Sequence, residues 1–379
     1  MQIIFINYAP YMITSGVHIH FLANEMFDMG HEVTVVVPEC VDNDQFGQQK
    51  YEFIDYNSFM SNVDSGKYSK STILHGWNPK ENVRKIIVEA SKKLSCGYFV
   101  HLEDNERCMI ERVMNMPFSE IQELVRQNKL QLSDGVIDPI LHEIFLAEAK
   151  GVSMLMDTLA EFVPDSVPKT VFWPGCESAF FGLSQTRNMH LRHQYNIDDE
   201  TYVIVFPGKI NPANAENIIP LYYALPLIES KGYKVICIRC SGRDYLKSEE
   251  IDVIREKYIR YFPDSMPKDL PIFLKMADIL VQPGQLDNFD NYRLPSKLPL
   301  FFASGRPVIL ARTNIGRFLE HDLNCKILKE NSAENIAEEV IDLIENPDKA
   351  KNIGSEGRNF AKKNFNWNIA AKKLLEMYK

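Results

Sequence analysis

Residues 290–310 read DNYRLPSKLPLFFASGRPVIL, and the rest of the chain is organised around this stretch. A basic, polar start precedes a short apolar run that predicts a helix, Gly305 suits a left-handed helix cap, and residues 307–310 predict a buried strand. The start of a helix exposes unpaired backbone N–H groups and carries positive partial charge. With Arg293 and Lys297 beside it, the stretch predicts a diphosphate site; the alternative is an ordinary strand-to-helix connection with solvated charges.

Continuous apolar runs that end in polar residues recur along both halves of the chain. Residues 2–7 and 32–38 predict two strands, and residues 17–29 between them predict a helix, which together make a βαβ unit. Further strands are predicted at 71–74, 97–100, 151–156, 202–207, 233–239 and 277–282. Two successive arrays of this kind predict an α/β protein with two doubly wound, Rossmann-like domains that face a central cleft.

Length and charge agree with two domains and exclude one class of partner. The 379 residues exceed one typical core. The formal charge of −9 comes from residues 1–190, which hold 15 Lys+Arg against 25 Asp+Glu, whereas residues 191–379 hold 27 against 26 and are nearly neutral. Because neither half is basic, the sequence predicts no nucleic-acid partner, while a small anion in the second half remains allowed.

Cysteine usage and the N-terminal sequence bear on compartment and cofactors. Seven cysteines, an odd number without dense spacing, favour a reducing compartment. The CxxC of Cys237 and Cys240 lies in a predicted strand with no second pair at zinc spacing, so no metal site is predicted. The N-terminus carries no targeting signal and no run approaches the roughly 20 apolar residues of a membrane span. The sequence therefore predicts a cytoplasmic protein.

A predicted helix at residues 80–94 has a basic tilt. Its basic residues are Lys80, Arg84, Lys85, Lys92 and Lys93. A solvated face is the commoner explanation of such a helix, and a peripheral contact with an anionic membrane surface is the alternative.

Polar residues gather where strands of the two predicted sheets end. They are His75, His101, Glu103, Asp104, Lys209, Ser241, Arg293 and Lys297. In open α/β sheets ligands bind beyond the carboxyl ends of the strands, so these side chains are candidates for chemistry. Two histidines and two carboxylates come from the first half and three basic residues from the second. This division suits an acceptor on the carboxylate side and an anionic leaving group on the basic side.

Several motifs occur in a particular order along nearly the whole chain. They are the Ser15-Gly16 loop, Gly30-His31-Glu32-Val33, the Pro174-Gly175 turn, Gly208-Lys209, and Leu294-Pro-Ser-Lys297 followed by Ala303-Ser-Gly305-Arg-Pro307-Val. Their colinear order resembles that of the GT-B glycosyltransferases, specifically retaining family 4. The resemblance implies an acceptor-side domain at residues 1–185, completed by a C-terminal helix at 366–379, and a donor-side domain at 195–365.

The resemblance also implies roles for matched residues in transfer from a nucleotide-diphosphate sugar to a glycan or glycolipid acceptor. Donor-binding candidates are Ser15, Gly16, Lys209, Ser241, Gly242, Asp290, Arg293, Ser296 and Lys297. Catalytic candidates are His101, which would face the transferred sugar, and Glu103 and Asp104 near the acceptor; His75 and Trp77 are acceptor-side candidates. Transfer would need no metal or cofactor, because cations and the helix start stabilise the departing nucleoside diphosphate, and the family's expected course is retention.

Two departures from the family pattern leave alternatives open. The family usually carries a pair of glutamates around residues 290–310; the second, which holds the ribose, is replaced by Leu300, and Asp287 or Asp290 would have to serve as the first. The second basic residue after Gly208-Lys209 is also missing. Losing one charge-assisted hydrogen bond costs about 1.5 to 3 kcal/mol. A degenerate member that binds a nucleotide or glycan without catalysis, or a nucleotide-sugar epimerase, therefore remains an alternative.

Overall fold

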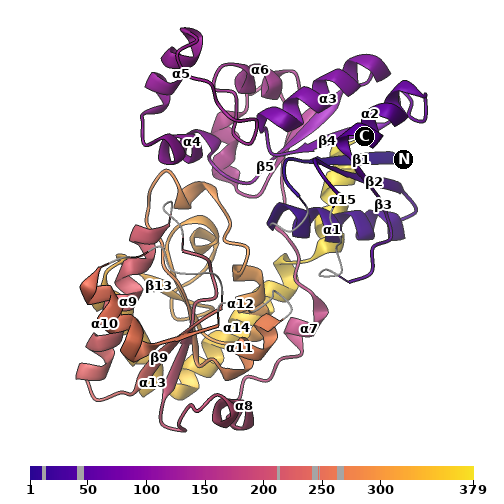
Figure 1. Ribbon diagram of the computed structural model, residues 1–379. Helices are drawn as coiled ribbons and strands as arrows, with labels where there is room; N and C mark the ends of the chain where they lie inside the picture. Colours follow the sequence, from indigo (N-terminus) through magenta and orange to yellow (C-terminus); the bar gives the residue numbers. More distant parts are fainter. Residues whose placement is uncertain (11–13, 41–46, 211–213, 241–245, 247, 263–268) are drawn as a thin grey trace. The chain divides into compact units, whose positions relative to one another are not determined.

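The computed structural model describes residues 1–10, 14–40, 47–210, 214–240, 246, 248–262 and 269–379. Its contacts divide the chain into two compact units. Unit 1 consists of Met1–Gly175, Tyr292–Leu294 and Asn366–Lys379, and unit 2 consists of Cys176–Asn291 and Pro295–Phe365 (Figure 1). The C-terminal segment thus belongs with the N-terminal residues. The domain boundaries given above stay a prediction.

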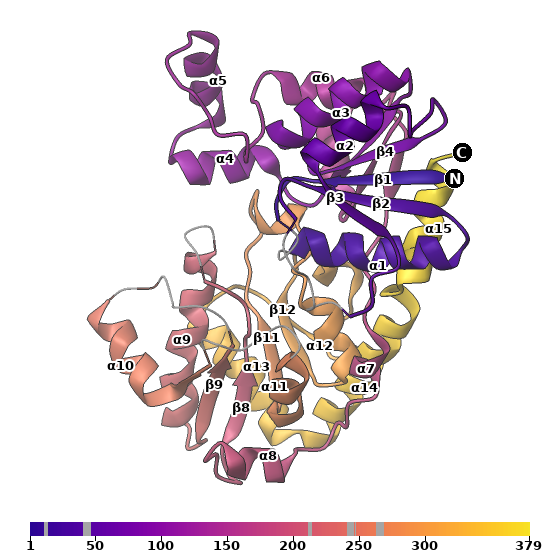
Figure 2. The same ribbon diagram turned by 45° about the vertical axis from the view of Figure 1, so that its right-hand side comes forward.

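Unit 1 is built on a seven-stranded parallel sheet in the order β3-β2-β1-β4-β5-β6-β7. Its strands are β1 Gln2–Asn7, β2 Glu32–Val37, β3 Glu52–Asp55, β4 Ile73–Trp77, β5 Tyr98–Leu102, β6 Gly151–Met154 and β7 Lys169–Val171. Its helices are α1 Thr14–Asp28, α2 Tyr56–Asp64, α3 Glu81–Leu94, α4 Glu106–Met114, α5 Phe118–Arg126, α6 Leu141–Ala147, the 3₁₀ helix η2 Asp157–Phe162, and α15 Trp367–Met377. Figure 2 shows α1 and α15 on one side of this sheet and α2 and α3 on the other. Because both faces are covered, the central strand β1 is apolar on both faces.

Unit 2 is built on a six-stranded parallel sheet in the order β10-β9-β8-β11-β12-β13. Its strands are β8 Tyr202–Val205, β9 Val235–Arg239, β10 Ile259–Tyr261, β11 Ile279–Gln282, β12 Val308–Ala311 and β13 Lys326–Leu328. Its helices are α7 Ser178–Phe181, α8 Met189–Gln194, α9 Ala215–Ser230, α10 Glu249–Tyr258, α11 Leu270–Met276, α12 Leu298–Ser304, α13 Ala333–Glu345 and α14 Pro347–Asn364, with 3₁₀ helices η4 Asp290–Tyr292 and η5 Asn314–Phe318. Helix α9 packs on α13, and α12 packs on α14.

Both sheets follow the same winding. Counted in chain order within each unit, the strands lie in the order 3-2-1-4-5-6, with β7 added at the edge in unit 1. The order reverses between β1 and β4 in unit 1 and between β8 and β11 in unit 2, and ligands of doubly wound sheets bind at such a switch point. The predicted fold class, α/β with two doubly wound Rossmann-like domains, is confirmed.

The stretch at residues 290–310 folds as its sequence predicts. Helix α12 ends at Gly305, whose φ of 74° is left-handed, and strand β12 follows. The Arg358 guanidinium lies against Gly305 and donates to the carbonyl oxygens of Ala303, at 3.0 Å, and Ser304. These bonds satisfy carbonyls that the helix end leaves unpaired. The guanidinium of Arg306 is buried and donates to backbone carbonyls, so the Gly-Arg-Pro segment is a packing element.

Two strands extend further than predicted, which corrects the position of two histidines. Strand β4 runs on to Trp77 and β5 to Leu102, so His75 and His101 lie within strands and not after them. The reason is that Trp77 and Leu102 are buried and continue the interior face beyond each histidine. The short strands β3, β10 and β13 were not predicted.

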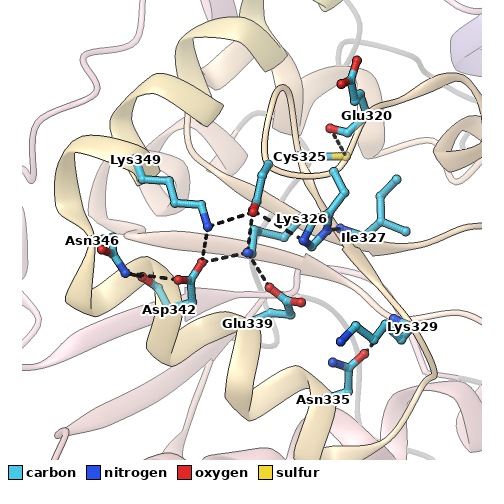
Figure 3. A network of polar contacts seen from close by, with 12 residues as sticks. Glu320, Cys325, Lys326, Ile327, Lys329, Asn335, Glu339, Asp342, Asn346 and Lys349 are labelled. Carbon is cyan, nitrogen blue, oxygen red and sulfur yellow. Dashed lines mark hydrogen bonds and ion pairs between the residues drawn. The ribbon is translucent and has the colours of Figure 1, made fainter.

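A buried lysine fastens the edge strand β13 to the helices that follow it (Figure 3). Lys326 Nζ lies 2.6 Å from Asp322, 2.6 Å from Glu339 and 2.7 Å from Asp342. Lys349 on α14 also binds Asp322 and Asp342, at 2.9 and 2.8 Å. Burial raises the pKa of Asp322, but hydrogen bonds from the two lysines outweigh it and hold the pKa at about 2. The network therefore stays charged at neutral pH.

Candidate functional site

A buried carboxylate, Glu103, collects hydrogen bonds at the switch point of the unit 1 sheet. It directly follows β5, and its Oε1 accepts from His18 Nδ1 at 2.8 Å and from Trp77 Nε1 at 3.0 Å. Its Oε2 accepts from the Ser15 hydroxyl and, at 3.2 Å, from Asn78 Nδ2. Ser15 and His18 are three positions apart on α1, so one face of that helix supplies both donors. The cluster joins α1 to the ends of β4 and β5.

The hydrogen bonds to Glu103 keep it ionised. Burial raises the pKa of Glu103, but the hydrogen bond and charge of His18, with smaller contributions from His101 and Ser15, lower it to about 2. His18 faces an ionised acceptor and therefore donates its Nδ1–H. Both oxygens of Glu103 are engaged inside unit 1, so the side chain anchors α1 and the Trp77 indole. Its predicted place near the acceptor stays a prediction.

The neighbouring carboxylate, Asp104, differs in charge state. It is half-buried, and burial together with the negative charges of Glu106 and Glu103 raises its pKa to about 7, against the opposing charges of Arg293 and Lys80. Arg293 belongs to the short segment that clusters with unit 1. A carboxyl group that ionises near pH 7 suits proton transfer at neutral pH. The two adjacent carboxylates thus have separate chemistry, one fixed as an anion and one able to titrate.

The three aromatic site candidates of unit 1, His75, Trp77 and His101, pack against one another in its interior. The His101 ring lies 4.0 Å from the Trp77 ring and 5.0 Å from the Phe172 ring, centroid to centroid. His101 Nδ1 is 2.7 Å from Ser153 Oγ, and burial holds the pKa of His101 well below its usual value. His75 and Trp77, like His101, have no exposed surface. The predicted contacts of His75 and Trp77 with an acceptor, and of His101 with a sugar, stay predictions.

In unit 2, basic side chains gather at the carboxyl end of β8. Lys297, which directly precedes α12, places its Nζ 5.3 Å from the centroid of the Phe206 ring. A Cβ added to Gly208 would lie 2.5 Å from the same Nζ, so the absence of a side chain there lets the ammonium approach the backbone. The Arg239 guanidinium, at the end of β9, lies 4.9 Å from the centroid of the same Phe206 ring. Two cations thus share one aromatic ring at the switch point of unit 2.

The other donor-side candidates differ in exposure. Lys209 and Ser296 are exposed. Ser15 and Gly16 are buried in the first turn of α1, which begins earlier than the helix predicted from residue 17. Ser241 and Gly242 lie outside the described residues. The donor-binding roles of these residues stay predictions.

The buried Asp290 side chain holds the loop after β11 in place through hydrogen bonds. Its Oδ2 accepts from Asn217 Nδ2 at 2.6 Å and from the Gln285 N–H at 3.0 Å. Its own N–H donates to Asp287 Oδ1 at 2.6 Å. These bonds tie the loop after β11 to the first turn of α9, and the predicted contact of Asp290 with a donor stays a prediction. Asn217 was missed in the sequence, although a polar residue in an otherwise apolar helix segment was a signal.

The basic helix α3 is largely neutralised by carboxylates. Lys80 forms a buried ion pair with Glu106. The further pairs are Arg84 with Glu81, Lys85 with Asp134 and Lys93 with Asp64. These partners remove most of the unpaired charge from which the membrane contact was argued, and that contact stays a prediction. In the described part of the chain no helix is long and apolar enough to cross a membrane.

One segment of unit 2 is similar to a known protein family. Residues 201–346, which include β8, Gly208, Lys297 and α12, match the family model of the glycosyl transferases group 1. The matched segment contains the β8 to α12 region with its paired cations.

Curated relatives and solved structures are also similar to this chain. It is 26% identical over 168 residues to an uncharacterized glycosyltransferase, MJ1069, of Methanocaldococcus jannaschii, covering 43% of this chain and 41% of that one. It is 22% identical over 191 residues to spore coat protein SA of Bacillus subtilis, covering 46% and 48%. The chain thus spans less than half the length of either relative. The structure of Anabaena Alr3699/HepE in complex with UDP and glucose matches with a TM-score of 0.73, at 13% identity, over 99% of this chain and 98% of that one, which shows the shared GT-B fold.

Proposed function

We propose that this chain is a retaining glycosyltransferase that transfers a sugar from a nucleotide-diphosphate sugar to a glycan or glycolipid acceptor. The observation that carries the proposal is the approach of Lys297 Nζ to Gly208 at the switch point of unit 2, within the family match. A glycine that leaves backbone accessible beside a cation suits a phosphate group. The UDP complex of the Anabaena structure makes UDP sugars the first donors to test.

On the donor side, positive charge is the means of catalysis. Lys297 and the exposed Lys209 would contact the diphosphate, with Arg293 and Ser296 from the same loop region. Fixed cations stabilise the negative charge that develops on the leaving diphosphate, and they do so without reorganising. Ser15 and Gly16 would bring the backbone of α1 toward the phosphates, as the resemblance implies.

On the acceptor side, Asp104 has the matching chemistry. An acceptor hydroxyl oxygen forms a bond to the anomeric carbon on the face from which the diphosphate leaves. The bond between that carbon and the diphosphate breaks, and the diphosphate departs with the electron pair. We assign the hydroxyl proton to Asp104, whose pKa of about 7 lets it accept a proton at neutral pH. Glu103 holds Ser15 and the indole beside it.

One observation favours a second candidate, a nucleotide or glycan binder without catalysis. Leu300 stands where the family's ribose carboxylate is expected, and the nearby Asp287 and Asp290 are engaged in folding their own loop. With fewer charge-assisted bonds, the donor would bind more weakly.

A donor panel separates these functions. The purified chain is mixed with UDP, GDP and TDP sugars, and the melting temperature and the release of free nucleoside diphosphate are measured. The proposal expects one donor to raise the melting temperature and to be turned over, slowly by hydrolysis and faster with an acceptor glycan. Binding without release supports the non-catalytic binder, and conversion of the donor's sugar without any acceptor supports the epimerase. No response to any nucleotide sugar would rule out the proposal.

A further inference from the structure

A buried chain of hydrogen bonds leads from the C-terminal helix to His101. The Tyr378 hydroxyl, at the C-terminal end of α15, lies 2.5 Å from His75 Nδ1 on β4. His75 Nε2 lies 3.2 Å from Ser153 Oγ on β6, and the same Oγ lies 2.7 Å from His101 Nδ1 on β5. All four side chains are buried. This chain of hydrogen bonds thus joins three neighbouring strands of unit 1. It ends at His101, the residue that the family resemblance predicts to face the transferred sugar.

The direction of these bonds follows from the Tyr378 hydroxyl. Within the described residues it has no hydrogen-bond partner besides His75, so its proton can only go to His75 Nδ1. Burial lowers the pKa of His75 to about 3, against a hydrogen bond to the Val100 carbonyl that raises it, so the ring is neutral. Because Nδ1 accepts from Tyr378, the single proton of the ring is on Nε2. His75 Nε2–H then donates to Ser153, and the Ser153 hydroxyl donates to His101 Nδ1. Since His101 is also neutral, its proton is on Nε2.

The reverse direction is less favourable. In the reverse direction, His75 Nδ1–H would donate to the Tyr378 oxygen. The buried Tyr378 O–H would then have no acceptor. An unsatisfied buried donor shifts such an equilibrium by roughly 10-fold or more. The chain of hydrogen bonds therefore selects one tautomer of His101, although none of its four side chains is charged.

We propose that Tyr378 is a positioning residue which, through His75 and Ser153, holds His101 in the Nε2-protonated tautomer as a hydrogen-bond donor to an oxygen of the bound sugar. This inference rests on the proposed glycosyltransferase function. His101 Nε2 is buried and has no hydrogen-bond partner in the described part of the chain. Because buried polar groups are ordinarily paired, a substrate oxygen would complete its bonding. His101 therefore donates a hydrogen bond and does not act as a base.

The position of Tyr378 depends on how α15 docks. At the other end of the helix the Trp367 ring stacks on Phe21 of α1, with centroids 5.2 Å apart and planes 18° apart. The Tyr378 ring packs edge-on against Phe99, at 4.9 Å. Replacement of Tyr378 by Phe keeps this packing and removes only the hydroxyl, so the variant tests the hydrogen bond alone.

The test is ¹⁵N NMR of histidine-labelled protein, which distinguishes protonated from unprotonated ring nitrogens. The His101 signals are assigned by their loss in His101→Gln. In the unaltered protein we expect about nine-tenths of His101 to be protonated at Nε2, and in Tyr378→Phe, where neither direction is favoured, about half. Ser153→Ala breaks the chain at its centre and is expected to give the same mixture. Tyr98→Phe is the control, because the Tyr98 hydroxyl is also buried in unit 1 but donates to the Phe145 carbonyl at 2.9 Å.

Kinetics provide the second readout. In Tyr378→Phe, kcat should fall about twofold, in proportion to the Nε2-protonated share, while KM for the donor is unchanged; Tyr98→Phe should change neither. Nδ1 protonation of His101 in the unaltered protein, or an unchanged tautomer in both Tyr378→Phe and Ser153→Ala, would overturn the inference. If the proposed function is wrong, no donor is turned over, yet the tautomer measurement still decides whether the chain of hydrogen bonds fixes His101.

Discussion

Replacing Glu103 by Gln tests whether this carboxylate anchors the unit 1 cluster. The substitution keeps the shape of the side chain but removes its charge and turns one accepting oxygen into a donating amide. That amide would face either the His18 and Trp77 donors or the Ser15 and Asn78 donors. Two of the four hydrogen bonds are therefore lost, and buried donors are left unpaired.

The size of the effect follows from the pKa of Glu103. The drop from the ordinary value of 4.5 to about 2 corresponds to about 3 kcal/mol of stabilisation. Because the pKa is depressed in the folded state, this stabilisation is fully present above pH 4.5 and is lost as the pH falls toward 2. Glu103→Gln should therefore lower the free energy of unfolding of unit 1 by about 3 kcal/mol at pH 7, and the difference from the unaltered protein should narrow below pH 4.5.

Tryptophan fluorescence during urea unfolding measures the free energy of unfolding of unit 1. All three tryptophans, Trp77, Trp173 and Trp367, lie in unit 1. The control is Glu89→Gln, which removes an exposed carboxylate 3.1 Å from Lys93 and should change the free energy by less than about 0.5 kcal/mol. If Glu103→Gln unfolds at the same urea concentration as Glu89→Gln, the carboxylate is no anchor.

Three further predictions concern unit 2, the pH dependence and the phosphate site. Lys326→Met should lower the free energy of unfolding by about 3 kcal/mol, because it leaves the buried Glu339 carboxylate uncompensated. Lys349→Met, at a more exposed position, should lower it by about 1 kcal/mol, and urea unfolding followed by circular dichroism compares the two variants. Turnover should rise with pH through about 7 as Asp104 ionises, and Asp104→Asn should be slower and lack that rise; an identical pH profile would exclude Asp104 as proton acceptor. Gly208→Val should weaken donor binding by forcing Lys297 away. Gly182→Ala, where an added Cβ makes only an ordinary contact, should leave donor binding unchanged, and titration calorimetry measures both variants.

The sequence predicted the parts of the fold that rest on local pattern. Strands such as β1 are covered on both faces, so their continuous apolar runs stand out, and Gly305 was recognised because a helix end there needs a left-handed residue. The strands β3, β10 and β13 were missed because each contains a charged residue, Glu52, Arg260 and Lys326, so no continuous apolar run marks them. A polar residue in an apolar run usually marks the end of a strand, so the sequence predicts His75 and His101 after their strands, although the buried face of each strand continues past the histidine.

The candidate site could be predicted where its residues lie next to the end of a strand or the start of a helix. Glu103 and Asp104 follow β5, Lys297 directly precedes α12, and the structure gives each a distinct environment. Tyr378 could not be found, because its contact with His75 joins residues 303 positions apart and depends on the return of α15 to unit 1. The sequence also could not indicate that the Asp290 carboxylate accepts hydrogen bonds from Asn217 and from the backbone of its own loop, since these bonds depend on side-chain geometry.

The binding of the donor diphosphate by Lys297 is tested most directly by measuring the affinity of the Lys297→Ala variant for the donor. Isothermal titration with the nucleotide sugar that stabilises the unaltered protein is compared with Lys297→Ala and with Lys231→Ala, a lysine at the C-terminal end of α9. If Lys297 binds the diphosphate, its removal should weaken binding at least about 10-fold, since a charge-assisted hydrogen bond contributes about 1.5 to 3 kcal/mol, while Lys231→Ala binds like the unaltered protein. Equal affinity of all three proteins would contradict the assignment of this site to the donor.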